Sequence, residues 1–131
     1  MTALNWYLYT WKKSIYYHFS KENREDTMDR SILMKAIKNV ISKVAPEAEI
    51  ILYGSQARED AGPESDWDLL VLVDGPVDDN LTDAIRHRLY EIEWDTGEVI
   101  SCIVRNRTQW HQSPYSTTPF YQTVSQEGIP L

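Results

Sequence analysis

The stretch that decides the fold reads ILYGSQAREDAGPESDWDLLVLVDG and covers residues 51–75. Its two apolar ends predict two short buried strands. Between them lie a Gly-Ser pair, a polar segment and two aspartates that flank a tryptophan. Because strand side chains alternate between faces, Asp66 and Asp68 should point to one side and Trp67 to the other. Two neighbouring carboxylates beside a core are costly unless something neutralises them.

A divalent cation would neutralise this pair of carboxylates. Mg²⁺ prefers hard oxygen ligands, and its protein sites commonly combine one or two carboxylates with water and substrate phosphate oxygens. An Asp-x-Asp at the start of a strand supplies those carboxylates. The plainer alternative is that Asp66 and Asp68 cap turns at the end of the loop.

The Gly54-Ser55 pair is expected at a strand-to-helix turn. The first turn of a helix has free backbone N–H groups and the positive end of the helix dipole, which favour a phosphate. Glycine allows a phosphate to approach the backbone, and the serine hydroxyl can donate to a phosphate oxygen. A nucleoside triphosphate carrying Mg²⁺ would satisfy both halves of the stretch. The alternative for this pair alone is a helix start with a serine cap.

The flanking sequence predicts a small α/β layer structure with the order α-β-α-β-α-β-α. The expected elements are a helix from Asp29 that Pro46 ends, a strand at 49–53, a short helix at 55–60, a strand at 67–74, a helix at 79–94, a strand at 98–104 and a last helix between the N-cap Thr118 and Gly128. The strand at 98–104 is apolar on both faces, so we expect it in the centre of the sheet.

The motif resembles the signature of the minimal nucleotidyltransferases of the DNA polymerase β-like superfamily, which is roughly G-S-x-A-R-G, a short loop and S-D-x-D-[LI]. The matching residues are Gly54, Ser55, Ala57, Arg58, Ser65, Asp66, Asp68 and Leu69. The resemblance implies the polymerase β-like α+β fold, a small mixed sheet with helices packed mainly on one face. It also implies Mg²⁺ or Mn²⁺ on the two aspartates and the triphosphate on Gly54, Ser55 and Arg58.

The resemblance further implies transfer of a nucleoside monophosphate, AMP from ATP above all, to a hydroxyl acceptor with release of pyrophosphate. Minimal members are often antitoxins paired with a HEPN-type ribonuclease toxin, which is therefore the implied partner.

The sequence departs from the family pattern at two positions. Glu59 stands where the family usually has glycine, and an acid there would weaken anion binding unless it points away. The family's third carboxylate has only Glu98 as a candidate on the strand that follows, with Asp95 as a fallback.

These departures support a second hypothesis, in which the chain is a catalytically weak or inactive nucleotide-binding antitoxin that acts by binding another protein.

The net charge of −7 argues against an extended nucleic-acid footprint, which needs clustered Lys and Arg. The single cysteine, Cys102, excludes an intrachain disulfide and is expected in the core. Without a signal peptide or an apolar stretch of about 18 residues, we expect a cytoplasmic protein. We interpret residues 1–27 as an aromatic-rich extension of a domain at 28–131.

Overall fold

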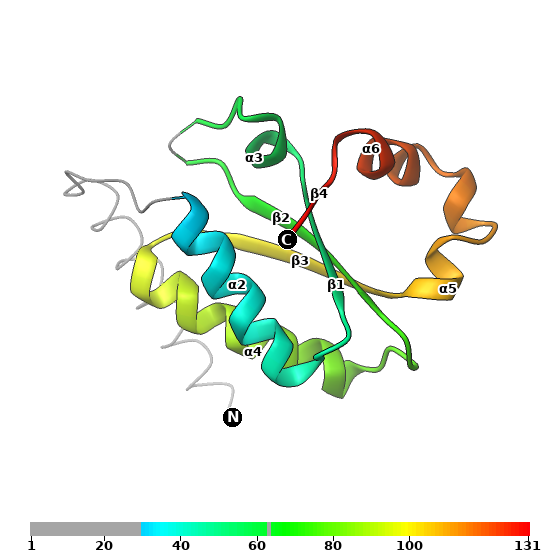
Figure 1. Ribbon diagram of the computed structural model, residues 1–131, viewed down its shortest axis with the longest axis horizontal. Coiled ribbons are helices and arrows are strands. Elements are labelled where there is room, and N and C mark those ends of the chain that lie inside the picture. Colours follow the sequence, from blue (N-terminus) through cyan, green and yellow to red (C-terminus); the bar gives the residue numbers. More distant parts are fainter. Residues whose placement is uncertain (1–29, 63) are drawn as a thin grey trace, which may run out of the picture.

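The computed structural model describes residues 30–62 and 64–131 (Figure 1). In chain order its elements are α2 (Arg30–Val44), β1 (Glu49–Tyr53), α3 (Ser55–Arg58), β2 (Trp67–Val73), α4 (Asp79–Thr96), β3 (Ile100–Asn106), α5 (Arg107–Trp110), the 3-10 helix η1 (Tyr115–Thr117), α6 (Pro119–Glu127) and β4 (Ile129–Pro130). The predicted mixed α and β fold is confirmed. The predicted boundary between residues 27 and 28 lies outside the described residues.

The four strands form one mixed sheet in the order β3-β2-β1-β4. The antiparallel pair β1 and β2 is joined by α3 and its loop, whereas the parallel pair β2 and β3 needs the longer connection that α4 provides. Every residue of β2 except Asp68 is buried. The prediction that the strand at 98–104 is central is wrong, because β3 lies at one edge of this sheet. Its exposed residues Ser101 and Arg105 lie on one face, where the half-buried Ile103 packs against Leu70 and Leu72, so this face is only partly covered.

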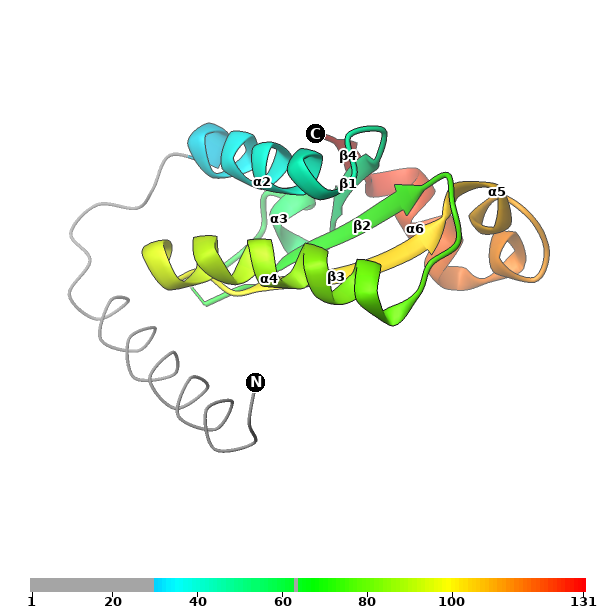
Figure 2. The same ribbon diagram turned by 90° about the horizontal axis from the view of Figure 1, so that it is seen from below.

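The two long helices, α2 and α4, lie side by side on one face of the sheet (Figure 2). Apolar residues at three- and four-residue steps put one side of each helix into the main core. This core contains Leu33, Ile37 and Ile41 of α2, Ile85, Leu89 and Ile92 of α4, and Trp67, Leu69 and Val71 of β2. Helix α4 begins at the N-cap Asp78, whose side chain accepts from the Leu81 N–H at 2.8 Å, and ends at Gly97 with φ +73°.

The opposite face of the sheet is covered by α5 and α6. Leu70 and Leu72 of β2 pack there with Trp110 and Val124, and the rings of Trp110 and Phe120 meet edge to face at 5.6 Å. The predicted limits of α6 are confirmed, since the Thr118 side chain accepts from the Tyr121 N–H and Gly128 follows the last residue.

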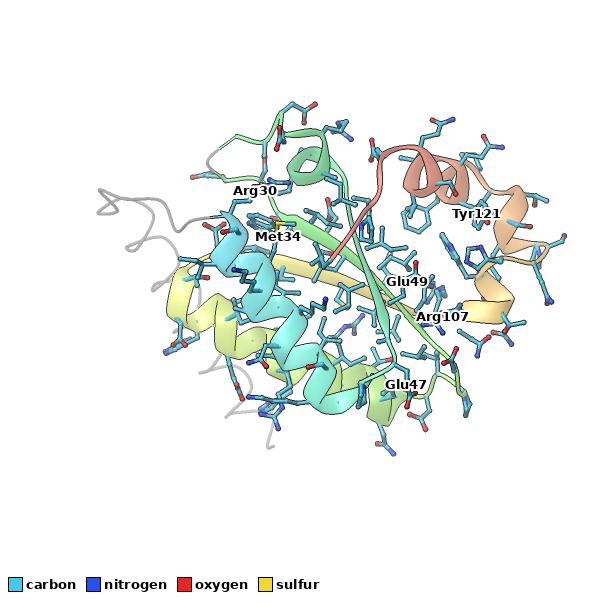
Figure 3. The ribbon with its side chains drawn as sticks, viewed as in Figure 1. Arg30, Met34, Glu47, Glu49, Arg107 and Tyr121 are labelled. Carbon is cyan, nitrogen blue, oxygen red and sulfur yellow. The ribbon has the colours of Figure 1, made fainter. Side chains whose placement is uncertain are left out.

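Arg107, at the start of α5, ties this second layer to the turn before β1. It donates to the Glu47 carbonyl at 2.8 Å and lies 3.6 Å from the Glu49 carboxylate (Figure 3). In the part of the chain that the structure describes, no helix combines the length and the apolar character needed to cross a membrane.

Candidate functional site

The Asp68 carboxylate lies against the backbone of Gly54, and this contact joins the two halves of the motif. In the antiparallel pairing of β1 with β2, Tyr53 is opposite Asp68, so Gly54 follows immediately beside the aspartate. A Cβ atom on Gly54 would collide with Asp68 Oδ2. Gly54 also has φ +76°, a conformation that L side chains rarely adopt. The conformation therefore favours glycine at this position, and any side chain there would also displace the Asp68 carboxylate.

Asp68 is half-buried, on the same face of β2 as Leu70 and Leu72. Burial first, and then the charge of Asp66, raise the pKa of the Asp68 carboxyl, while Arg58 lowers it. Burial and the Asp68 charge likewise raise the pKa of Tyr53, which lies opposite, to about 12. The ionised Asp68 carboxylate is thus poorly solvated and close to a second negative charge, a condition that a bound cation would relieve.

Asp66 is exposed and comes one residue before β2 begins. The Trp67 N–H donates to the Val99 carbonyl at 2.8 Å, so strand pairing extends to this point. The structure therefore places Asp68 against Gly54 and the turn after it, and it places Asp66 close enough to Asp68 for its charge to raise the Asp68 pKa.

The turn after β1 is closed by the Gly54 carbonyl, which accepts from the N–H groups of Ala57 at 3.0 Å and Arg58 at 3.1 Å. Ser55 is half-buried, and within the described residues its hydroxyl makes no hydrogen bond, so the oxygen is available to a ligand. Glu59 ends α3 with φ 61° and an exposed side chain. A glycine would adopt this left-handed conformation without strain, which explains in backbone terms why the motif usually has one here.

The first residue of α2, Arg30, binds to α3. Arg30 donates to the carbonyl of Gln56, and the Gln56 side chain donates to the Ser65 carbonyl at 3.3 Å. The guanidinium of Arg30 also lies over the Trp67 ring at 5.4 Å from its centroid. These contacts connect α3 to the residues just before β2, so the two halves of the motif share one support.

Sequence reasoning did not identify Glu127, the last residue of α6. Its Oε1 accepts from the Gly54 N–H at 3.0 Å, and its two oxygens lie 3.2 and 3.1 Å from Arg58 Nη1. Arg58 Nε also donates to Asp60 at 3.0 Å. Glu127 is 73 residues from Gly54 in the chain. No local pattern could have predicted this contact.

The structure does not bring Glu98 to the face of Asp68. A Glu98 oxygen accepts from the Trp67 indole N–H at 3.3 Å, and Trp67 is buried in the core formed with α2 and α4. The β3 residue that pairs with Asp68 is Ser101, which is exposed. Across residues 30–62 and 64–131, no cluster of three or more His, Cys, Asp or Glu side chains could hold a metal ion. Mg²⁺ would therefore need phosphate and water oxygens beside Asp66 and Asp68, as is usual for this ion.

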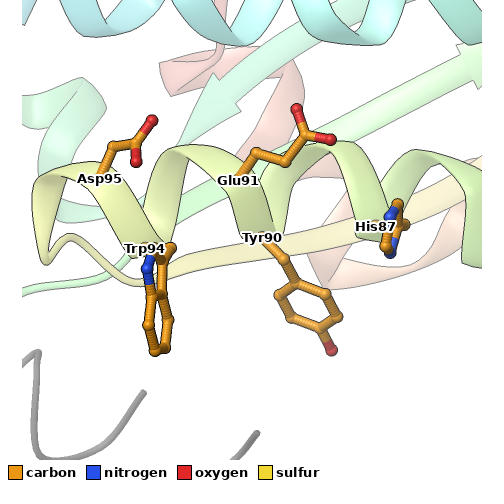
Figure 4. Close-up of a pocket in the computed structure, with 5 residues that line it drawn as sticks. All are labelled: His87, Tyr90, Glu91, Trp94 and Asp95. Carbon is orange, nitrogen blue, oxygen red and sulfur yellow. The ribbon is translucent and has the colours of Figure 1, made fainter. Parts of the chain in front are cut away.

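The fallback carboxylate, Asp95, is exposed on α4. It borders a cavity of about 410 Å³ with His87, Tyr90, Glu91 and Trp94 on the same helix (Figure 4). A smaller cavity of about 230 Å³ lies between α4 and β3, and Ser101 and Cys102 are among its lining residues. Cys102 is a buried free thiol whose pKa burial raises to about 11, so the prediction of a core cysteine is confirmed.

A family model agrees with this geometry. The model described as "Nucleotidyltransferase domain" matches residues 33–124, which is more than half of the chain. The match extends from α2 into α6 and includes both halves of the motif. A search of curated proteins finds no match.

Proposed function

The chain belongs to the nucleotidyltransferase domain family, and from this premise we propose that it transfers a nucleoside monophosphate, AMP from ATP, to a hydroxyl acceptor. The contact between Asp68 and Gly54 carries the proposal. It places the half-buried Asp68 carboxylate, which has the charge of Asp66 nearby, directly beside the turn that would hold phosphates. A single triphosphate could reach both, with its bound metal on the aspartates and its outer phosphates on Gly54 and Ser55.

The proposed role of each site residue follows from its position. Gly54 and Ser55 would position the β- and γ-phosphates through the Gly54 N–H and the Ser55 hydroxyl, and Arg58 would pair with phosphate charge. Asp66 and Asp68 would hold Mg²⁺, or Mn²⁺ in its place. The metal, when bound, would neutralise charge on the phosphates and make the acceptor hydroxyl more acidic.

In this reaction the acceptor oxygen forms a bond to the α-phosphorus. The bond from the α-phosphorus to the oxygen bridging to the β-phosphate breaks, and pyrophosphate leaves with that electron pair. The hydroxyl proton passes to solvent. Asp66 and Asp68 would hold the metal that neutralises the phosphate charge, and the turn would hold the leaving pyrophosphate. A reaction role for Glu98 stays a prediction, and it would require the Glu98 carboxylate to leave the Trp67 indole.

The test uses the full chain with α-³²P-labelled ATP, Mg²⁺ and the product of the neighbouring gene as acceptor. We expect labelled acceptor protein and pyrophosphate release, both abolished by Asp66→Asn with Asp68→Asn. Asp83→Asn removes a charge from an exposed position on α4 and should leave labelling unchanged. Absence of labelling with a partner that demonstrably binds the chain would contradict the transferase assignment.

A second candidate function is supported by Ser101 and Glu127. A serine stands opposite Asp68 where a further acid would complete a metal site, and a carboxylate already occupies the Gly54 N–H. In this alternative the chain is the antitoxin of a HEPN-type toxin in the cytoplasm and neutralises it by binding alone. Toxin inhibition that persists in the Asp66→Asn, Asp68→Asn variant would favour binding, whereas loss of inhibition in a variant that still binds would favour transfer.

A further inference from the structure

The carboxylate of Glu127 is bound by the same donors that the proposed function assigns to the nucleotide. It accepts from the Gly54 N–H at 3.0 Å and pairs with the Arg58 guanidinium at 3.1 Å. We propose that Glu127 competes with the triphosphate for these donors and thereby sets the affinity of the site. This inference rests on the proposed function and adds to it a residue that determines how tightly polyphosphates bind.

The backbone around Glu127 is held in place by its own packing. The Gly128 N–H donates to the Val124 carbonyl at 2.8 Å, and a Cβ on Gly128 would collide with that oxygen. Beyond it, β4 pairs with β1, and the Leu131 N–H donates to the Ile50 carbonyl at 2.9 Å. The end of α6 therefore cannot retreat without breaking strand pairing. Rotation of the Glu127 side chain, which is 19% exposed, is the simpler way to clear the donors.

A phosphate that approaches the turn has to replace this carboxylate. Gly54 has one N–H to donate, and Arg58 already uses Nη1 for Glu127 and Nε for Asp60. Hydrogen bonds to charged groups are among the stronger ones in proteins. Losing them, and then leaving an unpaired carboxylate close to phosphate, weakens binding of every anion that needs both donors. A triphosphate with Mg²⁺ offers more replacement contacts than a monophosphate, so the competition favours longer polyphosphates.

The experiment measures dissociation constants by calorimetry for inorganic tripolyphosphate without metal and for ATP with Mg²⁺. We compare the full chain with Glu127→Gln, which removes the charge and keeps the size of the side chain. We expect binding of both ligands to tighten, on the order of tenfold, because the ligand no longer displaces a charge-assisted contact. Glu127→Ala is a second variant, and a thermal melt of each checks folding.

Glu59→Gln is the matched control. It removes the same charge from the residue that follows α3, but the Glu59 side chain is exposed and forms no hydrogen bond or ion pair within the described residues. We expect it to change the dissociation constants less than twofold. In an Arg58→Ala background, Glu127→Gln should give a smaller gain than in the parent, because part of the competition acts through Arg58.

Three results would overturn the inference. If Glu127→Gln binds ATP with Mg²⁺ as tightly as the parent or more weakly, Glu127 does not compete with the nucleotide. The proposed function would still stand. An equal gain in Glu59→Gln would show a general charge effect instead of occupancy of the donors. If neither the parent nor any variant binds either ligand, both proposals fail: the nucleotide site and the competing role of Glu127.

Discussion

The Asp68 carboxylate lies so close to Gly54 that a Cβ at residue 54 would force this carboxylate to move. One residue belongs to the turn that begins α3 and the other to the start of β2. The pairing of Tyr53 with Asp68 across β1 and β2 holds them together. The proposed metal ligand and the proposed phosphate turn are therefore parts of one rigid arrangement, and each can be tested through the other.

Gly54→Ala should destabilise the protein by about 2–5 kcal/mol. The positive φ alone costs an L residue about 1–2 kcal/mol, and overpacking adds about 1–3 kcal/mol. Urea denaturation measures this loss. Gly75→Ala is the control, since nothing lies within 4 Å of a Cβ there and its φ is not positive. Combining Gly54→Ala with Asp68→Ala should recover only the steric part. Equal effects of the two glycine substitutions would contradict the packing argument.

Mn²⁺ should broaden NMR signals around Asp66 and Asp68, and Asp66→Asn with Asp68→Asn should abolish that broadening. Ser101→Asp should tighten Mn²⁺ binding on the order of tenfold, about 1.4 kcal/mol, because it adds a carboxylate directly opposite Asp68. Thr108→Asp, at an exposed position in α5, adds the same charge elsewhere and serves as the control. Broadening that survives the double substitution would place the metal at another site.

The stability of the metal-free protein should fall as Asp68 ionises. Burial and then Asp66 raise the Asp68 pKa in the folded state above its ordinary value of 3.8. The folded state therefore binds this proton more tightly than the unfolded state, so the stabilisation is complete below pH 3.8 and is lost as pH rises through the folded pKa. Asp68→Asn should be more stable than the parent at neutral pH, and this advantage should shrink in acid.

Melts in EDTA between pH 3 and 7 measure that difference. Asp83→Asn, on the exposed side of α4, controls for removal of one negative charge. An advantage of Asp68→Asn that stays constant across this range would show that ionisation of Asp68 does not affect stability.

Glu59→Gly should stabilise the fold by about 1 kcal/mol relative to Glu59→Ala. Both substitutions remove the carboxylate, but only glycine adopts φ 61° without the left-handed penalty. Chemical denaturation of the two variants isolates the backbone effect, and their dissociation constants for ATP with Mg²⁺ report any effect of the lost charge. A Glu59→Ala variant as stable as Glu59→Gly would contradict the strain argument.

A protein that starts at Met28 should keep the fold, because α2 and the family match both begin after that residue. Its amide spectrum for residues 50–105 should match that of the full chain. A thermal melt provides the decisive measurement. A loss above about 2 kcal/mol would mean that aromatic residues of the 1–27 segment bury apolar area in the core, at about 25 cal/mol per Å². Such a loss would make the predicted domain boundary wrong.

The sequence by itself was enough to predict the elements whose signals are local. The apolar spacing in Arg30–Val44, the Thr118 cap of α6 and the apolar run of β2 each depend on residues within a few positions. The motif at 54–69 likewise predicted that Gly54 and Asp68 serve one ligand, a nucleoside triphosphate carrying Mg²⁺. The antiparallel pairing of β1 with β2 then places the two residues side by side.

Tertiary structure alone decided the relationships between distant segments. The apolar residues of β3 gave no sign that it lies at an edge, since periodicity reports burial and not which neighbour provides it. The register that pairs Ser101 with Asp68 depends on how α4 returns the chain to β2. The contact of Glu127 with Gly54 joins residues 73 positions apart. A local pattern specifies which way a side chain points from its own element, but only the packed chain determines what it meets there.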